Sequence, residues 1–227
     1  MPDFSKVLTI MINEEPPERT ATFIVDESVM TKRSKYFKAA CRDEWKEATS
    51  RTIKIPEVDT DAFCAYLHWV HLEQVAISTQ YDVEACSSDD APLVLDELIR
   101  LWLLADRLGD AQLCDCVIDT MLDVADSVDI SMDWTEAIPA EMLDLIYAAT
   151  SEGRSLRRLV VDIYAGDLES AQVERGRYEW HPEFVNDIML VYAQSDDVYY
   201  SDRRSCYYHE HLSLQTPLCM SPSGRGQ

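Results

Sequence analysis

The stretch RSKYFKAACRDEWKEA, residues 33–48, decides the fold because it combines an aromatic helix with a highly charged turn. Ser34 stands where a helix-capping hydroxyl is expected, and Tyr36 and Phe37 follow inside the first turn of that helix. The charged residues come next, and Trp45 interrupts them. We expect Phe37 to fill a core between helices and a sheet, and Trp45 to fold back as an anchor.

Three short β-strands are expected on either side of this stretch. KVLTIMI (6–12) and ATFIVD (21–26) are rich in β-branched and apolar residues, and a hairpin between them is the simplest arrangement. RTIKIP (51–56) alternates polar and apolar residues and ends at a proline. A small sheet is therefore predicted near the N-terminus.

Helices are expected to cover this sheet. Residues 60–71 show apolar positions at helical spacing, and residues 93–108 are apolar on nearly every face, which predicts a helix in the middle of the core. Gly109 is expected to end the second of these helices. Capping side chains are expected at the helix starts, namely Ser28, Ser34, Asp59 or Thr60, and Asp110.

The second half of the chain reads as further helices. Pro139 opens one, a second runs between Gly153 and Gly166, and Pro182 opens a third. After residue 195 the periodicity is lost. We therefore divide the chain into a domain over 5–125, a C-terminal helical extension over 131–195, and a tail over 196–227 that is largely disordered or clipped by a metal ion.

Composition restricts the classes of function. The 227 residues have a net charge of −22, which repels nucleic acid and anionic membrane surfaces. No secretory signal is found, and the most hydrophobic segment is too short and too charged to span a bilayer. Seven scattered cysteines then favour reduced thiols over a disulfide framework. We expect a cytoplasmic or nuclear protein.

Taken in order, the segments resemble a BTB/POZ domain of the kind common in fungi. The resemblance rests on ATFIVDESVMTKRSKYFKAAC, on Trp45-Lys46-Glu47, on IKIPEVDTDAFCAYLHWVH and on LWLLADRLGDAQLCDCVIDTML. It implies an α+β fold in which a small sheet packs on a helical cluster over about residues 5–125, followed by the helical extension.

The resemblance also implies a function. BTB/POZ domains are non-enzymatic modules that bind other proteins, and many relatives bring substrates to a cullin-type ubiquitin ligase. For such a role the contact surface would come from helix 60–71, loop 72–92 and helices within 93–125. A self-associating regulatory scaffold is the alternative within the same class of proteins.

Two departures from the family pattern concern charge and length. In transcription-factor relatives an Asp pairs with an Arg in a charged pocket, whereas the matching positions here hold Lys6 and Glu27, with the signs reversed. Corepressor recruitment is therefore not expected. The sequence also begins directly at the first strand, so a homodimer that exchanges an extra N-terminal segment is not expected either.

Motifs for catalysis are missing from the sequence, which contains no GxSxG, P-loop, GxGxxG or HExxH pattern. His68 and His71 share a helix face, for which a solvated surface is favoured over a metal site. An acidic stripe on the helix after Asp110 is likewise read as a solvated face, with a docking surface for a basic partner as the alternative. The stripe consists of Asp115, Asp119, Asp123 and Asp126.

One constellation near the C-terminus could bind a metal ion. Cys206, His209, His211 and Cys219 carry the soft sulfur and imidazole ligands that tetrahedral zinc prefers. Four protein ligands would close the site, so the zinc would be structural, and a metal-dependent enzyme is the least favoured alternative. The competing interpretation is a disordered tail with unrelated cysteines and histidines.

Overall fold

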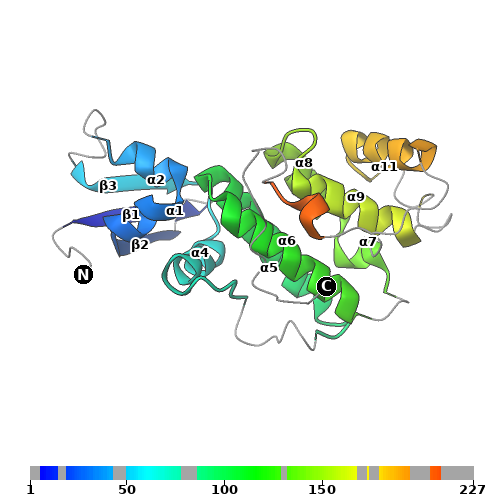
Figure 1. Ribbon diagram of the computed structural model, residues 1–227, viewed down its shortest axis with the longest axis horizontal. Coiled ribbons are helices and arrows are strands. Elements are labelled where there is room, and N and C mark those ends of the chain that lie inside the picture. The colour runs from blue at the N-terminus through cyan, green and yellow to red at the C-terminus, as the bar shows by residue number, and fades with distance from the viewer. Residues whose placement is uncertain are drawn as a thin grey trace. The chain divides into compact units, whose positions relative to one another are not determined.

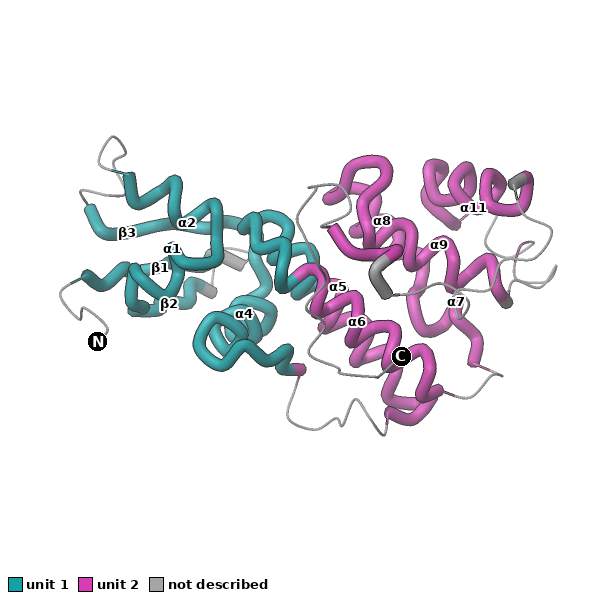
Figure 2. The backbone as a smooth tube through the Cα atoms, in the orientation of Figure 1, with its two compact units in different colours: residues 1–76, 100–113 teal, residues 77–99, 114–227 magenta. Residues whose placement is uncertain are grey.

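The computed structural model describes residues 6–14, 19–42, 50–77, 86–128, 132–167, 173, 179–194 and 205–210. The chain forms two compact units, coloured separately in Figure 2. Unit 1 contains residues 1–76 and 100–113, and unit 2 contains residues 77–99 and 114–227.

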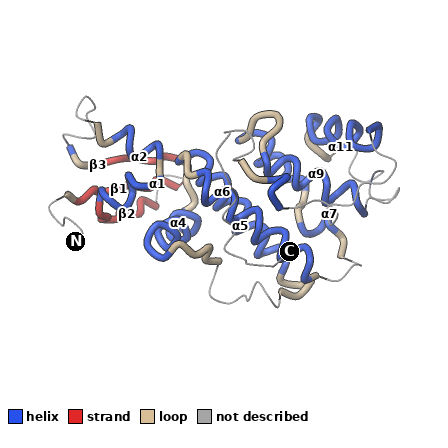
Figure 3. Tube along the Cα trace, in the orientation of Figure 1, coloured by secondary structure: helices blue, strands red, loops and turns tan. Residues whose placement is uncertain are grey.

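Unit 1 contains a three-stranded sheet in the order β2-β1-β3. β1 (Val7–Glu14) pairs antiparallel with β2 (Arg19–Asp26) and parallel with β3 (Thr52–Pro56) (Figure 3). The predicted hairpin is confirmed, and both of its strands extend further into the intervening turn than the sequence pattern indicated.

Alternation along the strands gives the sheet one buried and one open face. Leu8, Ile10 and Ile12 of β1 are fully buried, whereas Val7 lies half exposed at the opposite face. Ile24 of β2 is 75% exposed. The buried face therefore carries the core, and the other face is open to solvent.

In the described residues of unit 1, the sheet is accompanied by the helices α1 (Glu27–Arg33), α2 (Lys35–Ala40) and α4 (Thr60–Leu72). Figure 1 shows α1 and α2 beside the strands. Ser34 and Asp59 cap α2 and α4 as predicted. The prediction for α1 was wrong, because Asp26 at the end of β2 already accepts the Ser28 backbone N–H at 2.7 Å.

Aromatic side chains fill the core of unit 1. Phe37 is fully buried, as predicted from the opening stretch, and α2 ends three residues later. Phe63 and Tyr66 of α4 are also fully buried, and the Phe63 ring lies 5.0 Å from the ring of Phe23. The expected anchor Trp45 lies outside the described residues.

Two long helices follow: α5 (Ala91–Leu108) and α6 (Ala111–Ser127). α5 is buried along most of its length, as expected for a helix that is apolar on nearly every face. Gly109 ends it with a left-handed φ of 70°, and Asp110 accepts the Leu113 backbone N–H at 3.1 Å at the start of α6.

Unit 2 is helical in its described parts. It contains α7 (Trp134–Ala137), α8 (Ala140–Ala149), α9 (Ser155–Asp167), α11 (Pro182–Gln194) and the short 3₁₀ helix η3 (Ser205–Tyr208). Among the described helices, none is long and apolar enough to cross a membrane. The α+β fold class is confirmed.

Candidate interaction surfaces

The C-terminal end of α4 presents an exposed surface in unit 1. Leu72 is 58% exposed, and Cys64 and His71 are also exposed on this helix. Burial raises the pKa of the Cys64 thiol, and two neighbouring aspartates raise it further. These surroundings disfavour the thiolate form of Cys64.

A charged contact fixes this end of α4. Glu73 follows the helix in the left-handed conformation, with φ at 58°, and forms an ion pair with Arg33. The hydrogen bond from Arg33 lowers the pKa of the Glu73 carboxyl. Arg33 also lies over the ring of Trp69, whose Nε1–H donates to Asp110 at 3.1 Å. The ion pair and the hydrogen bond therefore hold in place the end of α4 that carries the exposed Leu72.

The expected charge pair at Lys6 and Glu27 takes a different form. The carboxylate of Glu27 pairs with Arg51, which also donates from Nε to the carbonyl of Val7 at 3.2 Å. The backbone carbonyl of Lys6 accepts a hydrogen bond from the backbone N–H of Glu27 at 3.0 Å. Glu27 thus links the start of α1 to the start of β3.

His68 and His71 differ in their surroundings. Nδ1 of His68 lies 3.2 Å from the carbonyl oxygen of Gln74, and His71 is exposed. Within the described part of the chain, no group of three His, Cys, Asp or Glu residues is placed to hold a metal ion. The preference for a solvated surface over a metal site here stays a prediction.

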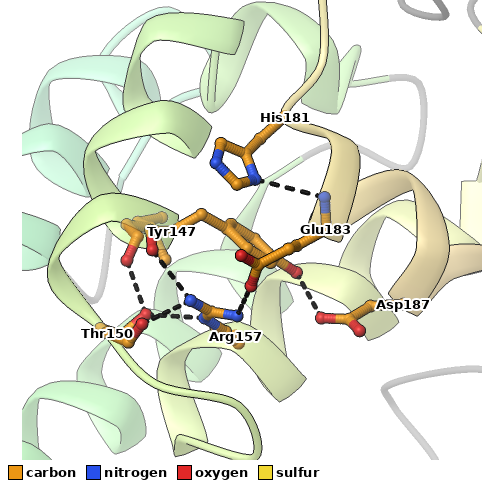
Figure 4. A network of polar contacts seen from close by, with 7 residues as sticks. Tyr147, Thr150, Arg157, His181, Glu183 and Asp187 are labelled. Atoms are coloured by element: carbon orange, nitrogen blue, oxygen red, sulfur yellow. Dashed lines mark hydrogen bonds and ion pairs between the residues drawn. The ribbon is translucent and has the colours of Figure 1, made fainter.

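In unit 2 a buried arginine joins three helices (Figure 4). Arg157 of α9 donates to the hydroxyl of Thr150 at 2.8 Å, to the carbonyl of Tyr147 at 2.9 Å and to the carboxylate of Glu183 at 2.7 Å. Its guanidinium also lies 4.1 Å from the centre of the Tyr147 ring. These contacts use most of the N–H donors of the Arg157 guanidinium, so we interpret the network as one that stabilises the fold.

Tyr147 extends the same network to α11. Its hydroxyl donates to Asp187 at 2.8 Å, and its ring stacks on His181 with the centroids 5.1 Å apart. Burial and the Asp187 carboxylate raise the pKa of the phenol far above its usual range. Tyr147 therefore stays neutral and acts as a donor.

The predicted metal ligand His209 lies in the four-residue segment Tyr207–Glu210, which we call the YYHE segment and of which the last three residues are buried. Nε2 of His209 lies 2.9 Å from Oδ1 of Asp119 on α6. The hydroxyl of Tyr208 donates to Asp162 on α9 at 2.9 Å. Neighbouring residues of the tail thus contact two different helices.

Glu210 completes the contacts of the segment. Its backbone N–H donates to Asp115 at 2.6 Å, and its carboxylate accepts the backbone N–H of Ser155 at 3.0 Å. The same carboxylate pairs with Arg154 at 2.9 Å. A carboxylate at the first residue of α9 is favourably placed, because the helix dipole is positive at that end.

The zinc prediction is only partly covered by the described residues. The side chains of Cys206, His211 and Cys219 lie outside them, and His209 has one ring nitrogen at a carboxylate. Such a carboxylate also orients metal-bound histidines in other proteins. The four-ligand zinc site therefore stays a prediction.

The acidic stripe of α6 is divided by the YYHE segment. Asp115 and Asp119 are in contact with it, so the prediction of a fully solvated face was wrong for these two residues. Asp123 and Asp126 are exposed as predicted. The physical reason is that a distant part of the chain supplies an N–H group and an imidazole to these carboxylates.

Sequence reasoning missed the partners of the YYHE segment on α9. Arg154 and Arg158 were placed only within the helix expected between Gly153 and Gly166, and Glu210 was not singled out. The one available signal was local: two tyrosines, a histidine and a glutamate in a row, inside a tail without periodicity.

Comparison with protein families connects unit 1 and the start of α5 with a known domain. Residues 8–100 match the model of the BTB/POZ domain. The chain contains a BTB/POZ domain. The matched range covers the sheet, α1, α2, α4 and the first half of α5, so the resemblance inferred from the sequence is confirmed. A comparison with curated proteins found no match.

BTB/POZ domains are protein–protein interaction modules. This function agrees with the exposed end of α4, which lies within the matched residues. It gives the coarse function of the chain as binding to other polypeptides.

Proposed function

We propose that this chain is a non-enzymatic adaptor whose BTB/POZ domain docks on a cullin scaffold and presents substrates to its ubiquitin ligase. The observation that carries the proposal is the match of residues 8–100 to the BTB/POZ family. We keep 5–125 as the proposed limits of the domain, 131–195 as a helical extension that widens the contact, and 196–227 as the tail.

The proposed contact includes the exposed end of α4. Leu72 is half exposed there, and the neighbouring Glu73–Arg33 pair holds the backbone in place. A braced apolar side chain can enter a partner's pocket at a small entropic cost. Leu72 is therefore the position at which the proposal is most directly tested.

The test measures binding of the purified full chain to a purified cullin scaffold by biolayer interferometry. We expect Leu72→Asp to weaken the affinity by about tenfold or more, because a carboxylate would replace an apolar anchor. Ile24→Asp is the matched control, since Ile24 is an even more exposed apolar residue of the same unit, on the open face of the sheet. It should bind like the wild type.

The other results are equally informative. No binding of the wild-type chain would overturn the adaptor role. A chain that binds no cullin but self-associates in light scattering would support the alternative of a regulatory scaffold. If Leu72→Asp and Ile24→Asp bind the cullin scaffold with the same affinity, the end of α4 does not belong to the contact.

A further inference from the structure

The YYHE segment is held like a short peptide in a receptor. Tyr208, His209 and Glu210 are consecutive, and each is at most 5% exposed. The side chains of Tyr208 and His209 contact Asp162 of α9 and Asp119 of α6, and the Glu210 carboxylate accepts a backbone N–H at the N-terminus of α9. These three contacts do not belong to a helix or a strand ladder of the segment itself. Three consecutive residues of the segment therefore make contacts with α6 and α9, as a bound peptide would.

The receptor side offers a defined chemistry. α6 contributes the carboxylates of Asp115 and Asp119, and α9 contributes Asp162, which is itself 2% exposed. A cation lies at each end of the segment: Arg154 pairs with the Glu210 carboxylate, and Arg158 lies 5.7 Å from the centre of the Tyr207 ring. Carboxylates therefore contact Tyr208 and His209 of the segment, and an arginine contacts Glu210.

We propose that this α6–α9 surface is a peptide-binding site and that the YYHE segment is its tethered ligand. An external ligand would be a polypeptide segment that presents a phenol, an imidazole and a carboxylate on consecutive residues. Twelve residues, 195–206, separate the segment from α11 in the sequence. A tether of this length gives an effective concentration of about the millimolar range, so a partner binds by competing with the chain's own tail.

The test uses the full chain with Tyr208→Ala and Glu210→Ala, which weaken the tethered ligand and leave the receptor residues intact. The probe is a fluorescent peptide of residues 205–211 that carries Cys206→Ser to prevent disulfide formation. In anisotropy titrations we expect the probe to bind this variant about tenfold or more tightly than it binds the wild type, whose site is already occupied.

Two controls examine recognition. A probe that also carries Glu210→Ala should lose most of its affinity, because it leaves Arg154 without its carboxylate. Adding Arg154→Gln to the weakened chain should reduce binding of the original probe in the same way. A weakened chain that keeps the wild-type circular dichroism spectrum and melting temperature but binds no probe would overturn the proposal.

A second measurement decides the case if the weakened chain does not fold. A protease site is placed within 195–204 of the otherwise unchanged chain, and the purified protein is cleaved. If excess probe then releases the tail fragment while the remainder stays folded, the segment is an exchangeable ligand. If the fragment does not exchange, or if its release unfolds the protein, the segment is an integral part of the fold and the proposal fails.

Discussion

At the scale of single residues, the molecule places polar side chains at junctions between elements. Asp110 is the clearest case in unit 1. It is 3% exposed, accepts the Trp69 indole N–H and caps the start of α6. Burial disfavours its charged form and raises the pKa of its carboxyl above the ordinary value of 3.8, although both hydrogen bonds oppose that shift.

This pKa shift predicts the pH dependence of Asp110→Asn. A carboxyl with a raised pKa binds its proton more tightly in the folded than in the unfolded protein. Its contribution to stability is therefore lost as the pH rises from about 3.8 through the folded-state pKa. Relative to the wild type, the variant should gain unfolding free energy across this window. Urea titrations at a series of pH values measure the difference, and a difference that does not change with pH would contradict the prediction.

At the scale of elements, two glycines lie in the turns between consecutive helices, Gly109 between α5 and α6 and Gly153 between α8 and α9. Gly109 and Gly153 have φ values of 70° and 76°, a region that side chains with a Cβ enter at a cost of about 1–2 kcal/mol. Their surroundings differ. A Cβ at Gly109 would lie 3.0 Å from the Cβ of Lys35, whereas none of the described atoms lies within 4 Å at Gly153.

The two positions form a matched pair for mutation. Gly153→Ala should lower the free energy of unfolding by about 1–2 kcal/mol, which is the conformational cost alone. Gly109→Ala should cost more than this, because Lys35 and α2 must also shift. Thermal or urea unfolding of both variants measures the costs. Equal losses would show that the contact with Lys35 relaxes freely.

Most elements follow from local sequence patterns, and the exceptions are instructive. The strands, the caps at Ser34 and Asp59 and the end of α5 at Gly109 depend on neighbouring residues, so periodicity and turn chemistry predicted them. The cap of α1 was assigned to Ser28. The predicted strand ended at Asp26, as observed, but the sequence did not show that the helix begins at the very next residue, Glu27.

At the scale of the whole molecule, charge is divided unevenly between the two units. Unit 1 contains 12 Lys and Arg residues and 15 Asp and Glu residues, which gives a formal charge of −3. Unit 2 contains the other 8 and 27, which gives −19. Repulsion among like charges should therefore oppose folding mainly in unit 2.

This asymmetry predicts a different response to salt in each unit. Raising the ionic strength until the Debye length falls well below about 10 Å should stabilise unit 2 more than unit 1. Hydrogen exchange followed by mass spectrometry measures the two separately, from peptides of α9 and α11 and from peptides of β1 and α4. Equal changes in protection, or a larger one in unit 1, would contradict the prediction.

The sequence by itself determined the family, the small sheet, the aromatic core and the positions of most helices, because alternation, helical spacing and capping act between residues that are close along the chain. Only the tertiary structure decided the surroundings of His209 and the partial covering of the acidic stripe. His209 meets Asp119 across 90 positions of sequence, and Glu210 meets Arg154 across 56. No local pattern encodes such pairs, since they form only when α6, α9 and the tail fold together.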